Sequence, residues 1–243
     1  MTVMRHLSAA LAACALLMTA ACDVPQPPAT TASPVFLAPG ARMSPGEAMA
    51  TFNRVVAAVE PVAESECRRR TPGRRCDFQI VVASDSALPS NAYQSIDGAG
   101  RPVITFTQAL IRDAGNADEL AFVMSHEAAH HIRDHLTRQR RNAETAAVVF
   151  GGLASLNGLG TTEVETAQKL GAVVGARTYS KDFELEADEL GTIIAWRAGF
   201  DPLVGAGFFS RIPDPGNRFL GTHPPNGDRI ATVRRTSATL GLN

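Results

Sequence analysis

The segment of this chain best suited to chemistry is His126-Glu127-Ala128-Ala129-His130. On a helix, residues four apart lie about 40° apart around the axis, so both imidazoles can reach a single metal ion. Glu127 follows His126 and borders the same face, where its carboxylate can reach a water on that ion. Zinc lowers the pKa of such a water to about 7, and a carboxylate can take its proton as it attacks a carbonyl. The spacing therefore predicts a hydrolytic zinc centre.

The third protein ligand must come from farther along the chain, because catalytic zinc takes three protein ligands and keeps one position open. Arg133 and Leu136 occupy the places where the metzincin pattern needs glycine and histidine, which excludes that class. Downstream, Glu184 and Asp188 lie four residues apart and share one face of a predicted helix. We expect Glu184 to bind the metal, and Asp188 to accept a hydrogen bond from a ligand histidine and fix its tautomer.

Four neighbouring polar residues are assigned no part in this site. His131 and His135 follow the motif closely, but their helical positions point away from the two ligand histidines. Each is expected to be a buried or capping histidine. Glu186 and Glu189 fall off the ligand face of their helix, and both are expected to face solvent.

Hydrophobic periodicity predicts the elements that must position these residues. Apolar residues recur with the helical period over 117–140, which predicts a single helix there. The Ala-, Gly- and Val-rich stretch 143–159 is too short and too interrupted to span a membrane, so we expect a buried or substrate-facing helix. Helices and strands in separate blocks indicate an α+β domain, mostly helical with a small three-stranded antiparallel sheet. Further helices are expected at 45–59, 181–198 and from 202 to before 213, and strands at 77–83, 91–96 and 102–107.

The beginning of the chain is expected to direct export. A short basic head precedes the uncharged apolar stretch 7–21, which has the length of a secretory signal rather than of a membrane-spanning helix. The stretch ends in Thr19-Ala20-Ala21-Cys22, which resembles a bacterial lipobox; the alternative is a plain signal peptide cut near residue 21. We predict a signal peptide at 1–21, lipidation of Cys22, a Pro-, Ala- and Thr-rich tether at 22–43 and one domain at 44–243.

The composition of the chain excludes some classes of protein. The chain has 243 residues, 45% of them hydrophobic, and a formal net charge of −1. This length suits one domain with a sizeable core, and the near-neutral charge argues against nucleic acid as a partner. Once Cys14 and Cys22 are assigned to the export segment, Cys67 and Cys76 remain. In an exported protein these two are expected to form a disulfide.

Five ordered segments of the chain belong together as a pattern. They are Asn91-Ala92-Tyr93, Val123-Met124-Ser125-His126-Glu127-Ala128-Ala129-His130-His131-Ile132-Arg133-Asp134-His135, Glu184-Leu185-Glu186-Ala187-Asp188, Ala198-Gly199-Phe200-Asp201-Pro202, and Thr222-His223-Pro224-Pro225 followed by Arg229-Ile230. Together they resemble the M48 family of zinc metallopeptidases over about residues 45–235. This resemblance implies a compact zincin-type domain in which His126, His130 and Glu184 bind one zinc ion. It also implies that Glu127 is the general base and acid and that Asp188 supports a ligand histidine.

His223 is assigned to the active site by the resemblance alone. In the family, a His-Pro at this place lies near the metal. There it either occupies the open zinc position in a latent state or donates a hydrogen bond to the developing oxyanion. The alternative is a histidine that hydrogen-bonds a loop carbonyl.

The function implied by the resemblance is hydrolysis of polypeptides in the bacterial cell envelope, on the periplasmic side and held at a membrane by the lipid anchor. Misfolded or misassembled envelope proteins are the expected substrates, and a substrate is expected to lie extended along segment 91–96. One alternative is a chaperone or assembly factor whose zinc-stabilised fold binds clients with little cleavage. Another is a zinc amidase or deacetylase of the cell wall, which shares the metal chemistry but not this order of motifs.

Overall fold

The computed structural model describes residues 43–178, 180–218, 221 and 223–242. The predicted signal peptide at 1–21, Cys22 and the tether up to residue 42 lie outside this range, so the expectations for them stay predictions. Both hydrophobic clusters of the fold are built from residues between Met43 and Val233. The described part of the chain therefore contains a complete core of its own.

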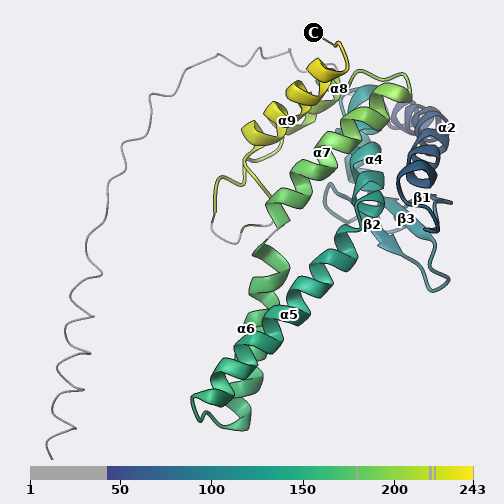
Figure 1. The fold of residues 1–243 in the computed structure, drawn as a ribbon. Coiled ribbons are helices and arrows are strands. Elements are labelled where there is room, and N and C mark those ends of the chain that lie inside the picture. Colours follow the sequence, from purple (N-terminus) through teal and green to yellow (C-terminus); the bar gives the residue numbers. More distant parts are fainter. Residues whose placement is uncertain (1–42, 179, 219–220, 222, 243) are drawn as a thin grey trace, which may run out of the picture. The chain divides into compact units, whose positions relative to one another are not determined.

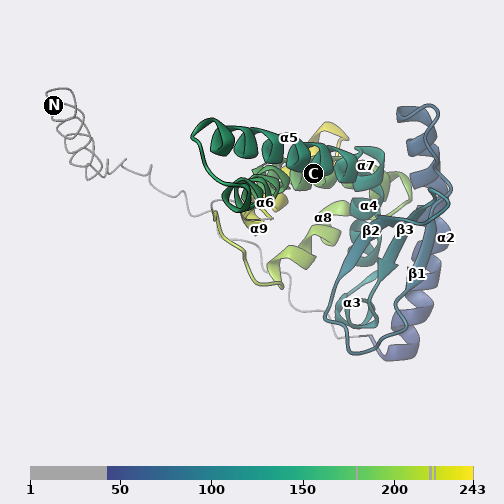
Figure 2. The same ribbon diagram turned by 90° about the horizontal axis from the view of Figure 1, so that it is seen from below.

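The fold is α+β and mostly helical, as predicted, with one small sheet at the side of a group of helices (Figures 1 and 2). The described strands are β1 Gln79–Val82, β2 Ala92–Ile96 and β3 Pro102–Phe106. The described helices are α2 Pro45–Arg70, α3 Gln108–Asp113, α4 Ala117–Ile132, α5 His135–Leu156, α6 Thr161–Thr178, α7 Ser180–Arg197, α8 Pro202–Gly205, the 3₁₀ helix η1 Ala206–Ser210 and α9 Asn226–Thr239.

Helix α2 begins where the sequence predicts and continues well past the predicted end. Ser44 and Glu47 form a reciprocal capping box at its first turn. Val59, Ala63 and Cys67 are buried at four-residue spacing, so the apolar stripe carries the helix past the predicted end at residue 59. A disulfide joins Cys67 to Cys76 and closes the loop that follows the helix.

The sheet is mixed, so the prediction of an antiparallel sheet was wrong in one pairing. The strand order is β1-β3-β2, with β3 antiparallel to β2 and parallel to β1. The tight turn 97–101 makes β2 and β3 neighbours, but β3 then enters between β2 and β1. The connection 83–91 is long enough to cross two strand spacings of about 4.8 Å each. Residue patterns within strands give no information on this spatial order.

Helix α4 is central and carries the histidine motif. It packs against α7 and α2 and lies against β2 and β3 (Figures 1 and 2). Leu120, Phe122 and Met124 of this helix are fully buried. Asn116 caps its first turn by accepting a hydrogen bond from the main-chain N–H of Glu119. Packing on several sides therefore fixes the backbone of the motif.

The helix predicted over 117–140 is broken, because α4 ends at Ile132 and α5 begins at His135. Between them Asp134 has a left-handed backbone with φ of 60°, a conformation that non-glycine residues adopt uncommonly. Arg74, from the loop closed by the disulfide, donates hydrogen bonds to Oδ1 of Asp134 at 2.8 Å and to the carbonyl oxygen of His131 at 3.3 Å. This contact from a distant segment stabilises the break, and periodicity could not reveal it.

Helices α5 and α6 form an antiparallel hairpin that projects from the rest of the domain (Figure 1). A Cβ at Gly171 or Gly175 of α6 would collide with the carbonyl oxygens of Ala146 and Asn142, so these glycines allow the two backbones to approach closely. Stretch 143–159 was expected to be buried or to face substrate. Burial is wrong for much of it, since Leu156 is 86% exposed.

The last elements cover α4 and α7 from one side. Segment 202–212, predicted as one helix, consists of α8 followed by η1, and α9 packs against α7 and η1. Asn226, the first residue of α9, donates from its side-chain amide to the carbonyl oxygens of Phe209 and Ile212 at 2.9 and 3.1 Å. In the described ranges, no helix combines the length and apolarity needed to cross a membrane.

Candidate functional site

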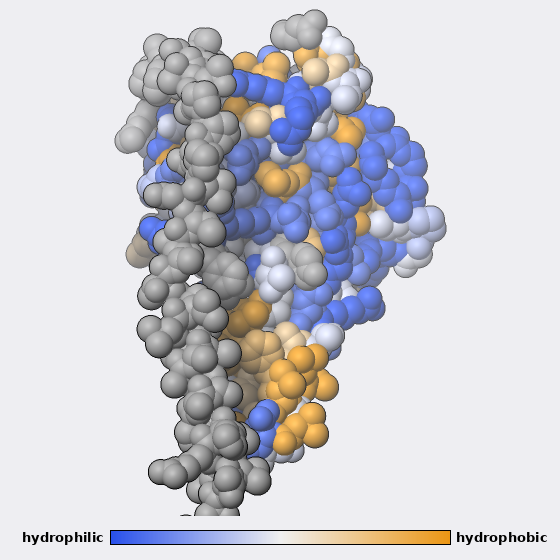
Figure 3. Space-filling model, turned by 60° about the vertical axis from the view of Figure 1, so that its left-hand side comes forward, coloured by the Kyte–Doolittle hydropathy of each residue, from blue (hydrophilic) through white to orange (hydrophobic). Residues whose placement is uncertain are grey.

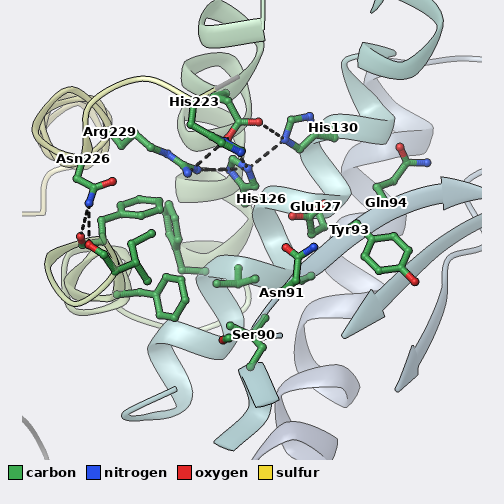
Figure 4. A pocket seen from close by; sticks show the side chains of 18 of the residues that line it. Ser90, Asn91, Tyr93, Gln94, His126, Glu127, His130, His223, Asn226 and Arg229 are labelled. Carbon is green, nitrogen blue, oxygen red and sulfur yellow. Dashed lines mark hydrogen bonds and ion pairs between the residues drawn. The ribbon is translucent and has the colours of Figure 1, made fainter. Parts of the chain in front are cut away.

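Helices α4 and α7 bring the three predicted metal ligands together. The Nε2 atoms of His126 and His130 lie 3.0 Å apart (Figure 4). The carboxylate oxygens of Glu184 lie 3.6 Å from Nε2 of His126 and 3.3 Å from Nε2 of His130. Ligand atoms of a tetrahedral zinc ion, each at 2.0–2.1 Å, would stand about 3.3 Å from one another. The three side chains are therefore spaced to hold one metal ion.

A close contact between the two helices sets this spacing. Gly191 of α7 faces the backbone of α4, where an added Cβ would lie 3.0 Å from the main-chain nitrogen of His126. Such a distance is tighter than most side chains accept, so glycine lets α7 approach the motif. Glu184 lies about two helical turns before Gly191, and its side chain reaches the histidine pair from there.

His126 is held from behind by Asp188. Its Nδ1 lies 2.9 Å from Oδ1 of Asp188, whose side chain is fully buried. When Nδ1 donates to this carboxylate, the neutral ring presents an unprotonated Nε2 to the other ligand atoms, as a metal ligand requires. The structure thus places Asp188 next to one of the two predicted ligand histidines.

His130 is held in the same way by His135, a residue that the sequence analysis assigned elsewhere. The Nδ1 atoms of the two rings lie 2.8 Å apart. Burial, together with the neighbouring His130, lowers the pKa of His135 to about 4. In the neutral ring, Nδ1 of His135 can accept a hydrogen bond from the Nδ1–H of His130, while its Nε2–H donates to Glu186 at 3.2 Å. The expectation that His135 points away was wrong, because the break at Asp134 redirects the chain.

Glu186 extends this chain of contacts. The expectation that it faces solvent holds only in part, because its side chain is 33% exposed and also contacts His135 and Arg138. Its carboxylate receives two hydrogen bonds from the guanidinium of Arg138, at 2.6 and 3.0 Å. This guanidinium lowers the pKa of Glu186 to about 2, with a further contribution from His135. The guanidinium of Arg138 and the ring of His135 also pack on the ring of Phe183, at 4.2 and 4.7 Å from its centroid. Glu189 is exposed, as expected.

Arg229 is the buried site residue that sequence reasoning missed. Its guanidinium donates to both carboxylate oxygens of Asp188, at 2.7 and 2.8 Å, and lies 3.4 Å from Oε2 of Glu184. It also stacks 4.0 Å above the ring of Phe209. Arg229 therefore balances two buried carboxylates at once. The Pro-Pro-x-x-x-Arg spacing was visible in the sequence, but nothing in it indicated that the arginine returns to this site.

Glu127 opens onto the cleft that contains the ligand group. The cleft has a volume of about 1030 Å³ and is bordered by α4, β2, α7 and the η1 region. Asn91 and Tyr93 of the strand region lie beside Glu127 in Figure 4. Burial raises the pKa of the Glu127 carboxyl above its ordinary value. A carboxylate of increased basicity beside a metal site is suited to accept a proton.

The cleft is bordered by the edge of the sheet, because β2 pairs with β3 on one side only in the described part of the chain. The main-chain N–H of Thr107 donates to the carbonyl of Asn91, and the N–H of Asp97 donates to the carbonyl of Arg101. Hydrogen-bonded and non-bonded positions alternate along an antiparallel pair. Ala92, Gln94 and Ile96 therefore direct their main-chain groups away from β3.

His223 reaches the site but lies outside the three-ligand group. Its Nδ1 is 3.0 Å from Oε2 of Glu184, and its side chain is exposed.

His131 does not line the cleft. Its Nε2 lies 2.7 Å from the carbonyl oxygen of Arg75, and its ring packs edge-on against Phe78. This matches the expectation of a buried histidine.

Comparison with known proteins identifies the family of this chain and several similar proteins. The sequence pattern of peptidase family M48 matches residues 50–237. A beta-barrel assembly-enhancing protease of Escherichia coli O157:H7 is 32% identical over 146 residues, covering 54% of this chain and 30% of the relative. A protein of the same name from Yersinia pestis is 28% identical over 173 residues, covering 66% of this chain and 34% of the relative. The chain therefore spans about a third of the length of these relatives.

Proposed function

Since the chain belongs to peptidase family M48, we propose that it is a zinc-dependent endopeptidase of the bacterial cell envelope. The observation that carries the proposal is the arrangement on α4 and α7. The three predicted ligand side chains line a cleft with their ligand atoms 3.0–3.6 Å apart, and Glu127 lines the same cleft next to His126. A surface pair of histidines on an ordinary helix would not need this buried third ligand or the carboxylate next to it.

The residues present fit zinc. Two imidazole nitrogens and one carboxylate form a common ligand set of hydrolytic zinc, which keeps a fourth position open. Asp188 and His135 hold the far nitrogens of the two ligand rings, the type of support that metal-bound histidines usually have. When bound, zinc would acidify a water molecule and polarise the scissile carbonyl.

Glu127 and His223 would supply the proton transfers and the contact with the oxyanion. Glu127 accepts a proton from the attacking water as the oxygen adds to the carbonyl carbon. It returns that proton to the amine nitrogen as the C–N bond breaks, giving one new carboxyl and one new amine. His223 stands next to the ligand group and either donates a hydrogen bond to the developing oxyanion or blocks the open position in a latent state.

We further propose an extended polypeptide as substrate. The outward main-chain groups of Ala92, Gln94 and Ile96 offer a free strand edge beside Glu127, and strand addition is a common mode of peptide recognition. The relatives are named as proteases that enhance β-barrel assembly, which supports misfolded or misassembled envelope proteins as substrates. The lipobox-like end at Cys22 supports attachment to a membrane on the periplasmic side.

The decisive test is cleavage of casein, an unfolded protein, with bound metal quantified. We expect one zinc per chain and cleavage by the wild type. Glu127→Gln should bind zinc equally and lose cleavage by at least a hundredfold, because one carboxylate serves both proton transfers. Zinc binding without cleavage by any form would contradict a general endopeptidase and favour a client-binding assembly factor.

His223→Ala separates the two roles proposed for this histidine. Higher casein cleavage by the variant would show that His223 blocks the open position. A fall in kcat with unchanged zinc affinity would show that it stabilises the transition state. If neither cleavage nor zinc affinity changes, His223 has no part in the site.

A further inference from the structure

The hairpin of α5 and α6 carries most of the large apolar side chains that are exposed in the described part of the chain. Twelve large apolar side chains are exposed in the described part of the chain, and seven of them lie between Val148 and Val173. Figure 3 shows apolar side chains gathered at the lower end of the molecule, where Figure 1 places the end of the hairpin. The seven are Val148, Val149, Leu153, Leu156, Leu159, Leu170 and Val173.

On α5 this surface is a continuous stripe. Val149, Leu153 and Leu156 follow one another at spacings of four and three residues, which places them on one face of the helix. Leu159, in the turn between the helices, is also exposed. From residue 145 to residue 162 the chain carries no charged side chain. The end of the hairpin therefore presents leucine and valine to solvent without a charge among them. We call this end, residues 149–162, the hairpin tip.

We propose that the hairpin tip docks into the interfacial region of a lipid bilayer. Shallow burial of an apolar helix face among headgroups and acyl chains requires no spanning segment, and the described helices include none. The exposed side chains are all aliphatic. Sites that bind proteins are instead marked by tryptophan, tyrosine and arginine, with leucine and valine under-represented.

The position of the predicted anchor favours the same partner. Twenty residues separate Cys22 from the first described residue, Met43, and an extended chain of that length can reach about 60 Å. Helix α5 is about 33 Å long. Chain length therefore permits the tip to touch the membrane that would hold Cys22. This part of the argument rests on the proposed attachment to the envelope.

The net charge of the hairpin predicts how its membrane binding should depend on lipid charge and on salt. Over residues 142–174 the charged side chains are Glu144, Glu163, Glu165 and Lys169, a net charge of −2. Such a surface gains nothing from anionic lipids, so the contact must depend on apolar burial. We expect binding to phosphatidylcholine vesicles to be at least as strong as binding to vesicles with phosphatidylglycerol, and to change little with salt.

The test is vesicle flotation of residues 23–243, which lack the predicted acylated cysteine and contain the whole described core. The wild type should float with phosphatidylcholine vesicles. The triple variant Leu153→Ser, Leu156→Ser, Leu159→Ser should bind more than tenfold more weakly. The control Met49→Ser, which removes an exposed apolar side chain from α2, should float like the wild type. Absence of wild-type flotation, or flotation that survives the triple substitution, would overturn the proposal.

Further measurements distinguish a bilayer from a polypeptide or a second copy of the chain as the partner of the hairpin tip. They also check that the variants fold. Leu156→Trp keeps the tip apolar, and its added fluorescence should shift to shorter wavelength with vesicles; an unchanged spectrum would contradict insertion. Casein cleavage in solution should be the same for the triple variant and the wild type, whatever the outcome of flotation. A triple variant that folds normally but loses cleavage would show a polypeptide-binding tip. One that loses dimerisation in analytical ultracentrifugation would show a contact between copies.

Discussion

The Nδ1 atoms of His130 and His135 lie 2.8 Å apart, although the two residues sit on different helices. One ring belongs to the last turns of α4 and the other is the first residue of α5. The contact depends on the left-handed backbone of Asp134 between them. A site that looks like one helical motif in the sequence is thus completed by the residue that follows a helix break.

Loss of this contact should weaken zinc binding. His135→Phe keeps an aromatic ring against Phe183 but removes the nitrogen that fixes the tautomer of His130. We expect zinc affinity to fall about 10- to 100-fold, the usual effect of removing such a supporting group. Competition with a chromogenic chelator measures the affinity. His131→Phe, which changes a buried histidine outside the cleft, is the matched control and should bind zinc like the wild type. Equal affinities in both variants would show that His135 does not support His130.

Removal of Arg229 should destabilise the fold even without metal. Arg229→Met leaves the buried carboxylate of Asp188 without its cation, and breaking one partner of a buried ion pair costs about 3–5 kcal/mol. Urea unfolding of the zinc-free chain measures this loss. Arg229→Lys should recover only part of it, because an ammonium cannot donate to both oxygens in the planar geometry of a guanidinium. A loss below about 1 kcal/mol in Arg229→Met would rule out this role.

The ion pair of Glu186 and Arg138 should contribute acid-sensitive stability. Because the pKa of Glu186 is lowered to about 2 in the fold, its contribution is present above about pH 4.5 and is lost as the pH falls toward 2. The pair is partly exposed, so we expect Glu186→Gln to cost about 1–2 kcal/mol at neutral pH after allowance for solvent screening. Urea unfolding of the zinc-free chain should show this difference shrinking between pH 4.5 and pH 2. A difference independent of pH would assign it to packing instead.

The disulfide should stabilise the loop that holds the helix break. Cys67 and Cys76 are nine residues apart, and closing a loop of this size is worth about 2–3 kcal/mol in the chain-entropy description. Cys67→Ala, Cys76→Ala should lose that amount in urea unfolding. Because Arg74 of this loop bonds Asp134, the double variant should also weaken zinc binding. If unfolding changes but zinc affinity does not, the loop does not influence the site.

Proline substitutions on β2 can test strand addition. Gln94→Pro removes an N–H that points away from β3, so it should raise KM for casein while the protein stays folded, as proline is tolerated on edge strands. Ser95→Pro instead removes an N–H that faces β3 and should lower the melting temperature. Steady-state kinetics and thermal unfolding separate these effects. An unchanged KM in Gln94→Pro would contradict pairing of substrate with this edge.

The parts predictable from the sequence were those that depend on local spacing. The histidine pair, the helix with Glu184 and Asp188, and the capped start of α2 all follow from patterns within one element. The spatial order of the strands, the break at Asp134 and the return of Arg229 each depend on contacts between distant segments. Arg74 stabilises the break from sixty residues away, and no periodicity in 117–140 reveals it.

Under the proposed strand addition, the edge of β2 that is unpaired in the described part of the chain determines which proteins would be attacked. Pairing through the main chain of Ala92, Gln94 and Ile96 reads no side chains, so it discriminates little between sequences. A strand that already has neighbours on both sides offers no unpaired main-chain groups. A polypeptide that has completed its sheet would therefore escape, while one delayed before that point would still fit the edge. Such an edge would select substrates by whether their strands are already paired, not by their amino-acid sequence.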